Sequence, residues 1–139
     1  MKKEKILLPI SFTYNLERAH NMWVYSEDEK KLKSFLLGLF NNAKVETDNC
    51  LYEVIGLLKD DKGDRRIIKE YVDCILENNY EEGREKIRVL IIYTNYFSHY
   101  LLNLIQIGYA FGFYIILGTT RLINSSFKAG CAAQINLDY

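Results

Sequence analysis

The sequence predicts a three-layer α/β domain with a parallel sheet of four or five strands. Short apolar runs alternate along the chain with segments whose apolar residues recur at helical spacing, a pattern typical of right-handed strand–helix–strand crossovers. The strongest runs are continuously apolar, as expected for strands that are buried on both faces. We expect the strand centres near Leu8, Val45, Ile91, Ile115 and Ile135.

The first half of the chain contains two short expected strands and one well-marked helix. We expect strands over residues 5–12 and 44–47 and a helix over residues 26–42. Ser26 is in the N-cap position of that helix, and Glu29 is in the capping-box position. Residues 48–59 keep a helical period without a clear assignment.

The second half is more strongly patterned. Residues 87–94 are rich in β-branched side chains, which favour a strand. We expect a helix from residue 64 or 65 to about 78. Strands are expected over 87–94 and 113–117, with a helix over 98–111 between them. The tail over 122–139 is expected to hold a helical turn and a last strand.

Composition restricts the classes of function. The 139 residues suit one domain, 1–139, and 18 basic residues balance 18 acidic ones. Nucleic acid is not an expected partner, since contacts with its phosphates require surplus cations. The cysteines Cys50, Cys74 and Cys131 show no CxxC spacing, which predicts neither a disulfide framework nor a zinc site and favours a reducing, cytoplasmic location.

Residues 89–120 contain no Lys, Arg, Asp or Glu and must be considered as a membrane span. A transmembrane helix needs roughly 20 continuous apolar residues. Here polar residues such as Asn95, His99 and Gln106 interrupt the stretch, together with several glycines. A buried strand, a turn, a helix and a second strand explain it better, so no membrane partner is expected.

Polar side chains follow two of the expected strands. Ser11 and Tyr14 follow the first strand, and Thr94, Asn95 and Ser98 follow a later one. Because ligands of parallel sheets bind beyond the carboxyl ends of the strands, these groups are candidates to hold a phosphate or a ribose. The alternative is that Thr94 and Ser98 only cap the following helix.

Standard motifs are absent. The sequence contains no GxxxxGK[ST], no GxGxxG and no GxSxG, and therefore no P-loop, dinucleotide fingerprint or nucleophile elbow. No HExxH or acidic cluster with metal-ligand spacing occurs. Neither a metal nor a cofactor is expected.

The stretch IRVLIIYTNYFSHYLLNLIQIGYAFGFYIIL, residues 87–117, resembles the core of the nucleoside 2-deoxyribosyltransferase superfamily, which has a Rossmann-like fold and includes deoxynucleotide N-hydrolases. Its QIGYA segment, beginning at Gln106, falls on that superfamily's Glu-x-Gly-Tyr-Ala stretch. The helix with Glu70 and Asp73 resembles the one that supplies the catalytic aspartate. Ser125 falls in a turn whose serine, in the hydrolases, reaches the phosphate of the neighbouring subunit's ligand.

The sequences SFTY at 11–14 and TNYFSHYLL at 94–102 are similar to bacterial TIR domains, which attack the nicotinamide N-glycosidic bond of NAD. Both resemblances imply a carboxylate acting at C1′ of a ribose. They imply a nucleoside, a nucleotide or an NAD-derived molecule as the ligand. A non-catalytic sensor or sponge for nucleotide signals is the alternative.

Both families place a glutamate where this chain has Gln106, and an amide can be neither a nucleophile nor a negative charge. Three explanations stay open: a natural pseudoenzyme that binds nucleotide, a Glu→Gln variant engineered to trap ligand, or a shifted alignment in which Glu70 or Asp73 acts instead. If the site is that of the families, Gln106 lies at the carboxyl edge of the sheet and faces Ser11, Tyr14 and Ser98.

The helix expected over residues 98–111 is apolar on nearly all sides. One face of a sheet cannot cover such a helix, so the sequence predicts a two-fold homodimer. The alternative is that the helix packs near Trp23 and Tyr25 within one chain.

Overall fold

The computed structural model describes residues 5–7, 13–15, 21–42, 44–46, 51–59, 65–77 and 86–138. At its centre lies a five-stranded sheet in the order β5-β6-β7-β3-β8, in which all neighbouring strands are parallel. Its strands are β3 (Met22–Tyr25), β5 (Leu51–Leu57), β6 (Lys86–Tyr93), β7 (Phe113–Thr119) and β8 (Ala133–Asn136).

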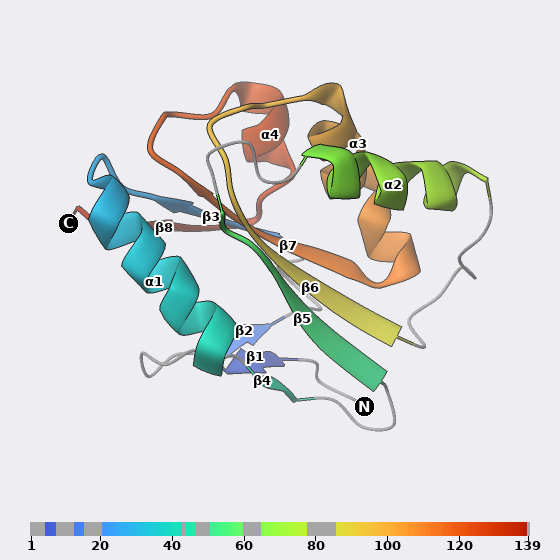
Figure 1. Ribbon diagram of the computed structural model, residues 1–139, viewed down its shortest axis with the longest axis horizontal. Coiled ribbons are helices and arrows are strands. Elements are labelled where there is room, and N and C mark those ends of the chain that lie inside the picture. Colours follow the sequence, from blue (N-terminus) through green and yellow to red (C-terminus); the bar gives the residue numbers. More distant parts are fainter. Residues whose placement is uncertain are drawn as a thin grey trace.

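Helices cover both faces of this sheet (Figure 1). On one face lies α1 (Glu29–Asn42), whose Leu32, Leu36 and Leu39 are fully buried against the strands. The other face carries α2 (Arg65–Leu76), α3 (His99–Ile107), the 3-10 turn η1 (Gly108–Phe111) and α4 (Ser125–Ala129). The predicted three-layer α/β fold with a parallel sheet is confirmed, with five strands.

Two of the expected strands belong to a different sheet. β1 (Lys5–Leu7) pairs antiparallel with β2 (Thr13–Asn15) and with β4 (Lys44–Glu46) in a separate three-stranded sheet. The expectation that the strands centred near Leu8 and Val45 join the parallel sheet is wrong for the described part of both segments, and Leu8 itself lies outside it. An apolar run indicates burial but does not identify the strand with which it pairs.

Their places in the parallel sheet are taken by β3 and β5, which the sequence pattern did not identify. β3 is only four residues long. In β5, the spacing of Leu51, Val54 and Ile55 also fits a helix, because a short apolar run carries too little periodicity to separate the two states. The whole of β5 pairs in register with β6, and this pairing makes it a strand.

The predicted helix at residues 26–42 begins later than expected. Its first helical residue is Glu29, and Asp28 caps it: Oδ1 of Asp28 accepts from the backbone N–H groups of Lys30 and Lys31 at 3.0 and 3.2 Å. The assignment of Ser26 as the N-cap is therefore wrong. Its hydroxyl accepts from the backbone N–H of Asp28 at 3.1 Å and so supports the turn before the cap.

The uncharged stretch at residues 89–120 forms most of β6, then α3 with η1, and β7, as predicted. None of the helices in the described ranges combines the length and the apolar character needed to cross a bilayer.

The apolar helix α3 is covered within the chain. It packs against α2, α4, η1 and β7, and its Leu101, Leu104 and Ile105 are buried in a core that also contains Trp23. Leu102 and other half-buried residues pack against the same core. One side of this helix is thus buried within the chain, as in the alternative interpretation, and the homodimer stays a prediction.

Glycines let α1 approach the sheet closely. A Cβ at Gly118 in β7 would collide with the side chain of Leu36. A Cβ at Gly56 in β5 would lie 3.1 Å from Cδ1 of Phe40. Leu36 and Phe40 occupy the space that these glycines leave, which fixes the position of α1 across the strands.

A buried amide joins the elements on the other face. Asn21 lies immediately before β3 and is 4% exposed. Its Nδ2 donates to the carbonyls of Ile105 at the end of α3 and Gly130 just after α4, at 3.1 and 2.9 Å. Its Oδ1 accepts from the backbone N–H of Ile115 in β7 at 2.9 Å. Three elements are therefore tied to the start of β3 by one side chain.

Replacing this amide should strongly destabilise the protein. Asn21→Ala removes two buried hydrogen bonds and a partly buried one and leaves the Ile115 N–H without its partner, so we expect a loss of about 2–4 kcal/mol in the free energy of unfolding. Urea denaturation monitored by circular dichroism measures the loss. The matched control is Asn41→Ala on the exposed side of α1, which should change stability by less than about 0.5 kcal/mol. Equal midpoints for the two variants would contradict the role of Asn21.

Candidate functional site

The connections of the parallel sheet diverge between β3 and β7. The chain leaves β3 toward α1 on one face, whereas it leaves β6 and β7 toward α3 and α4 on the other face (Figure 1). Ligands of parallel α/β sheets bind beyond the carboxyl ends of the strands at such a switch point. The candidate site is therefore formed by three loops, at residues 26–28, 94–98 and 120–124.

Side-chain hydrogen bonds join two of these loops. Nδ2 of Asn95 donates to Oγ1 of Thr120, and Oδ1 of Asn95 accepts from the backbone N–H of Thr120, both at 2.9 Å. Oγ1 of Thr94 accepts from the backbone N–H of Tyr96 at 2.9 Å and donates to its carbonyl at 3.1 Å. Thr94 and Asn95 thus lie at the carboxyl end of β6 as predicted, and these bonds hold the loops in place.

Two further hydroxyl groups at this edge also have partners within the chain. Oγ of Ser98 accepts from the backbone N–H of Leu101 at 3.2 Å and caps α3, so the capping interpretation is correct for Ser98. Thr119 is fully buried. Its Oγ1 accepts from Nε1 of Trp23 at 2.9 Å and donates to the carbonyl of Arg121 at 2.6 Å.

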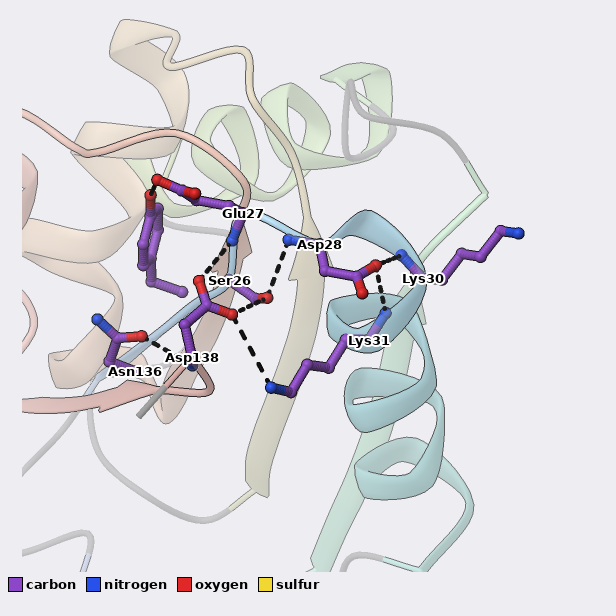
Figure 2. Close-up of polar contacts among 8 residues, drawn as sticks. Ser26, Glu27, Asp28, Lys30, Lys31, Asn136 and Asp138 are labelled. Atoms are coloured by element: carbon purple, nitrogen blue, oxygen red, sulfur yellow. Dashed lines mark hydrogen bonds and ion pairs between the residues drawn. The ribbon is translucent and has the colours of Figure 1, made fainter.

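A carboxylate near the C-terminal end of the described residues bonds the loop between β3 and α1. Figure 2 shows Asp138 reaching this loop: Oδ1 accepts from the Ser26 hydroxyl at 2.6 Å, and Oδ2 accepts from the backbone N–H of Glu27 at 2.9 Å. Nζ of Lys31 lies 4.0 Å from Oδ1. We call these contacts of Asp138 with Ser26, Glu27 and Lys31 the Asp138 latch.

The latch places a negative charge at the loop that precedes α1. The hydrogen bond from Ser26, then that from the backbone of Glu27, and the charge of Lys31 hold the pKa of Asp138 below its ordinary value of 3.8. The carboxylate is therefore ionised at neutral pH. Helix N-termini attract phosphate through free N–H groups and the helix dipole. At the start of α1, Asp28 accepts from the N–H groups of Lys30 and Lys31, and Asp138 accepts from the N–H of Glu27 just before the cap.

Gln106 does not lie at this edge. It is the exposed, second-to-last residue of α3, and the chain continues from there through η1 to Gly112, whose carbonyl accepts from Arg88 near the start of β6 at 2.8 Å. Eight residues of helix, about 12 Å, separate Gln106 from Ser98. The expected placement beside Ser98 is wrong, because α3 runs from the carboxyl edge back to the amino edge of the sheet.

The other candidate residues are dispersed. Glu70 and Asp73 lie on α2, where Oδ2 of Asp73 forms a 2.9 Å ion pair with Nζ of Lys69 on the same helix. Tyr14 lies in β2, in the smaller sheet, and Ser11 is outside the described residues. Ser125 is the exposed first residue of α4. The structure therefore brings together Thr94, Asn95 and Ser98, but not the carboxylates that the resemblance implies.

No strong nucleophile or metal site accompanies the three loops in the described part of the chain. Burial raises the pKa of the Cys131 thiol to about 12, which keeps it protonated and unreactive. In the same part of the chain, no three His, Cys, Asp or Glu side chains are placed to hold a metal ion.

Comparisons with known proteins bear on the fold. No protein-family model matches the chain, and no curated protein matches it. Among solved structures, the cytoplasmic domain of EssC is similar, with a TM-score of 0.55 and 14% sequence identity over 90% of this chain. The chain spans 32% of the length of that protein chain. The likeness is one of fold.

Gln106→Glu tests the catalytic interpretation directly. Because the side chain is exposed and remote from Ser98, we expect a stability change below about 0.5 kcal/mol and no gain of base release from deoxynucleotides or of nicotinamide release from NAD. The matched control is Gln134→Glu, at another exposed position in β8. A large rise in release that is specific to Gln106→Glu would restore the catalytic interpretation.

The Asp138 latch should stabilise the protein in a pH-dependent manner. A carboxyl whose pKa is lowered by folding adds stability above its unfolded pKa, and this contribution is lost as the pH falls through the folded-state value. We expect Asp138→Asn to unfold at lower urea concentration than the wild type at about pH 7, with the difference shrinking below about pH 4. Glu70→Gln, at an exposed carboxylate on α2, serves as the control. Equal stability of Asp138→Asn and wild type at neutral pH would show that the latch adds nothing.

Proposed function

We propose that this chain is a non-catalytic α/β domain that acts by associating with protein chains. The observation that carries the proposal is the Asp138 latch. It occupies the Ser26 hydroxyl and the Glu27 N–H, polar groups of the β3–α1 loop that could otherwise contact a ligand at the carboxyl edge of the sheet.

The chemistry of the loop supports this proposal. A strand, a loop and a helix in this order is the form of a P-loop, in which glycines expose backbone N–H groups to a phosphate. The loop after β3 consists instead of Ser26, Glu27 and Asp28, without glycine. A phosphate would have to displace Asp138 and lie beside the carboxylates of Glu27 and Asp28, and the repulsion between like charges opposes that.

The similarity to the cytoplasmic domain of EssC shows that this architecture also occurs as one part of a longer polypeptide, since the chain matches 32% of that chain. A domain whose loop after β3 is occupied by its own carboxylate can contribute its outer surface to contacts with other protein chains without turning over a ligand.

A second candidate function is the binding of a nucleoside, a nucleotide or an NAD-derived molecule without cleavage. The gathering of Thr94, Asn95, Ser98 and Thr120 at the carboxyl edge favours it, since hydroxyl and amide groups at this edge suit a ribose or a phosphate. Such a ligand would have to compete with the hydrogen bonds that these side chains make to their own loops.

Thermal denaturation with ligands separates the two candidates. A ligand at about 100 times its Kd would stabilise the fold by about 2.7 kcal/mol. For ATP, deoxynucleoside monophosphates, NAD and cyclic ADP-ribose at millimolar concentration, we expect no change in Tm. A reproducible increase with any of them would contradict the first candidate and support the second. An increase in Asp138→Asn but not in the wild type would identify the latch as the obstruction.

A further inference from the structure

Two opposite charges at the carboxyl edge lack an ionic partner within the described ranges. The side chain of Glu27 accepts a hydrogen bond from the Tyr25 hydroxyl at 3.4 Å, and no cation among those residues is within ion-pair distance of it. Arg121 is exposed, and no described carboxylate pairs with it. Among the described residues, neither charge is neutralised by an ion pair.

These two side chains lie on neighbouring loops. β3 and β7 are adjacent parallel strands, and their last residues, Tyr25 and Thr119, are register partners. The backbone N–H of Ser26 donates to the carbonyl of Thr119 at 3.3 Å, just beyond the strands. Glu27 is two residues after Tyr25, and Arg121 is two residues after Thr119. An acidic and a basic residue therefore lie on the two loops that flank the switch point.

Apolar side chains accompany the arginine. Leu122 is 72% exposed, and Tyr96 in the neighbouring loop is 49% exposed. The residues that follow them are anchored: Ile123 is buried, and the Phe97 ring lies 5.5 Å from that of Phe127. We call Glu27, Tyr96, Arg121 and Leu122 the carboxyl-edge face.

The loops that carry this face are held in place before any partner binds. The paired hydrogen bonds between Asn95 and Thr120 join the two loops, and the Thr119 hydroxyl holds the carbonyl of Arg121. A surface ordered in advance loses little conformational entropy when it associates. Exposed Tyr and Arg side chains on such a surface are typical of a binding site.

The charge around the face is divided. The guanidinium of Arg65 lies 4.5 Å from the centre of the Tyr96 ring, and the sequence from 94 to 124 contains no acidic residue. On the other side of the switch point, Glu27 and Asp28 are adjacent and exposed, followed by the exposed Lys30 and Lys31. The face therefore has a positive, apolar part around Arg121 beside the acidic Glu27.

We infer that the carboxyl-edge face binds the same face of a second copy of this chain, in a two-fold dimer in which Glu27 of each copy meets Arg121 of the other. A two-fold axis between the neighbouring loops superposes each half of the face on its opposite, so one rotation satisfies both charge pairs. Leu122 and Tyr96 supply apolar area beside the charges. The inference rests on the proposed function, association with protein chains.

A second copy is the partner that these observations favour. A self-complementary face needs both signs of charge, and the chain as a whole carries no net charge. A nucleic acid would need a surface with surplus cations, and only one half of this face is positive. A different acidic protein would use Arg121 and leave Glu27 without a role.

Sedimentation equilibrium of the full chain between about 10 μM and about 1 mM tests the dimer. We expect a concentration-dependent dimer that weakens as salt is raised from about 0.05 to about 0.5 M. Arg121→Glu and Glu27→Lys should each weaken it at least about tenfold, because each variant brings like charges together at both contacts. Circular dichroism checks that both variants remain folded.

Mixing the two variants gives the most specific result. In a mixed dimer of Arg121→Glu with Glu27→Lys, every contact again joins opposite charges, so the equimolar mixture should dimerise within about threefold of the wild type. A structural effect of either substitution would not be reversed by mixing. No recovery in the mixture would overturn the inference.

Matched leucine variants test the apolar part. Leu122→Ser should weaken the dimer, whereas Leu76→Ser, at a leucine that is 65% exposed at the end of α2, should not. A wild-type chain that stays monomeric at about 1 mM, or equal effects of the two leucine variants, would overturn the inference. Either result would leave the proposed function standing, because that proposal fails only if nucleotides or NAD derivatives raise the Tm.

Discussion

The arrangement of this domain depends on one buried amide. Asn21 uses both its donor and its acceptor capacity on backbone groups of α3, β7 and the end of α4, which lie far from it in the sequence. Because buried backbone groups without partners are costly, these elements are held at fixed positions around the start of β3. The short strand β3 is thereby placed between β7 and β8, where its own four residues would supply little pairing energy.

The position of β3 determines which loops meet at the switch point. Its carboxyl end meets that of β7, and the loop that follows leads to α1 on the opposite face of the sheet. The start of a helix attracts anions, and here Asp28 caps α1 while Asp138 bonds the N–H of Glu27 just before the cap. The backbone bond from Leu137 to Tyr25 at 2.8 Å holds Asp138 close to this loop. An internal carboxylate has a high effective concentration at this site, which favours it over a free phosphate.

The candidate site was predictable only where it follows a strongly patterned strand. Thr94, Asn95 and Ser98 come directly after β6, so the prediction of that strand was enough to place them at the carboxyl edge. Gln106 was placed by a resemblance over short motifs, and the direction of α3 puts it near the opposite edge. The partners Ser26 and Asp138 are 112 residues apart, and no local pattern indicates that they meet.

The sequence by itself determined the fold class, the helices α1, α2 and α3, and the strands β6, β7 and β8. Each of these elements has a helical period or an apolar run that is recognisable in its own segment. Only the tertiary structure decided that β3 and β5 join the parallel sheet while β1 and β4 pair elsewhere. It also decided that Asp138 bonds the loop after β3 and that Glu27 lies on the loop next to that of Arg121. Strand pairing and hydrogen bonds between distant residues are properties of the packed chain, and the periodicity of a short segment contains no information about them.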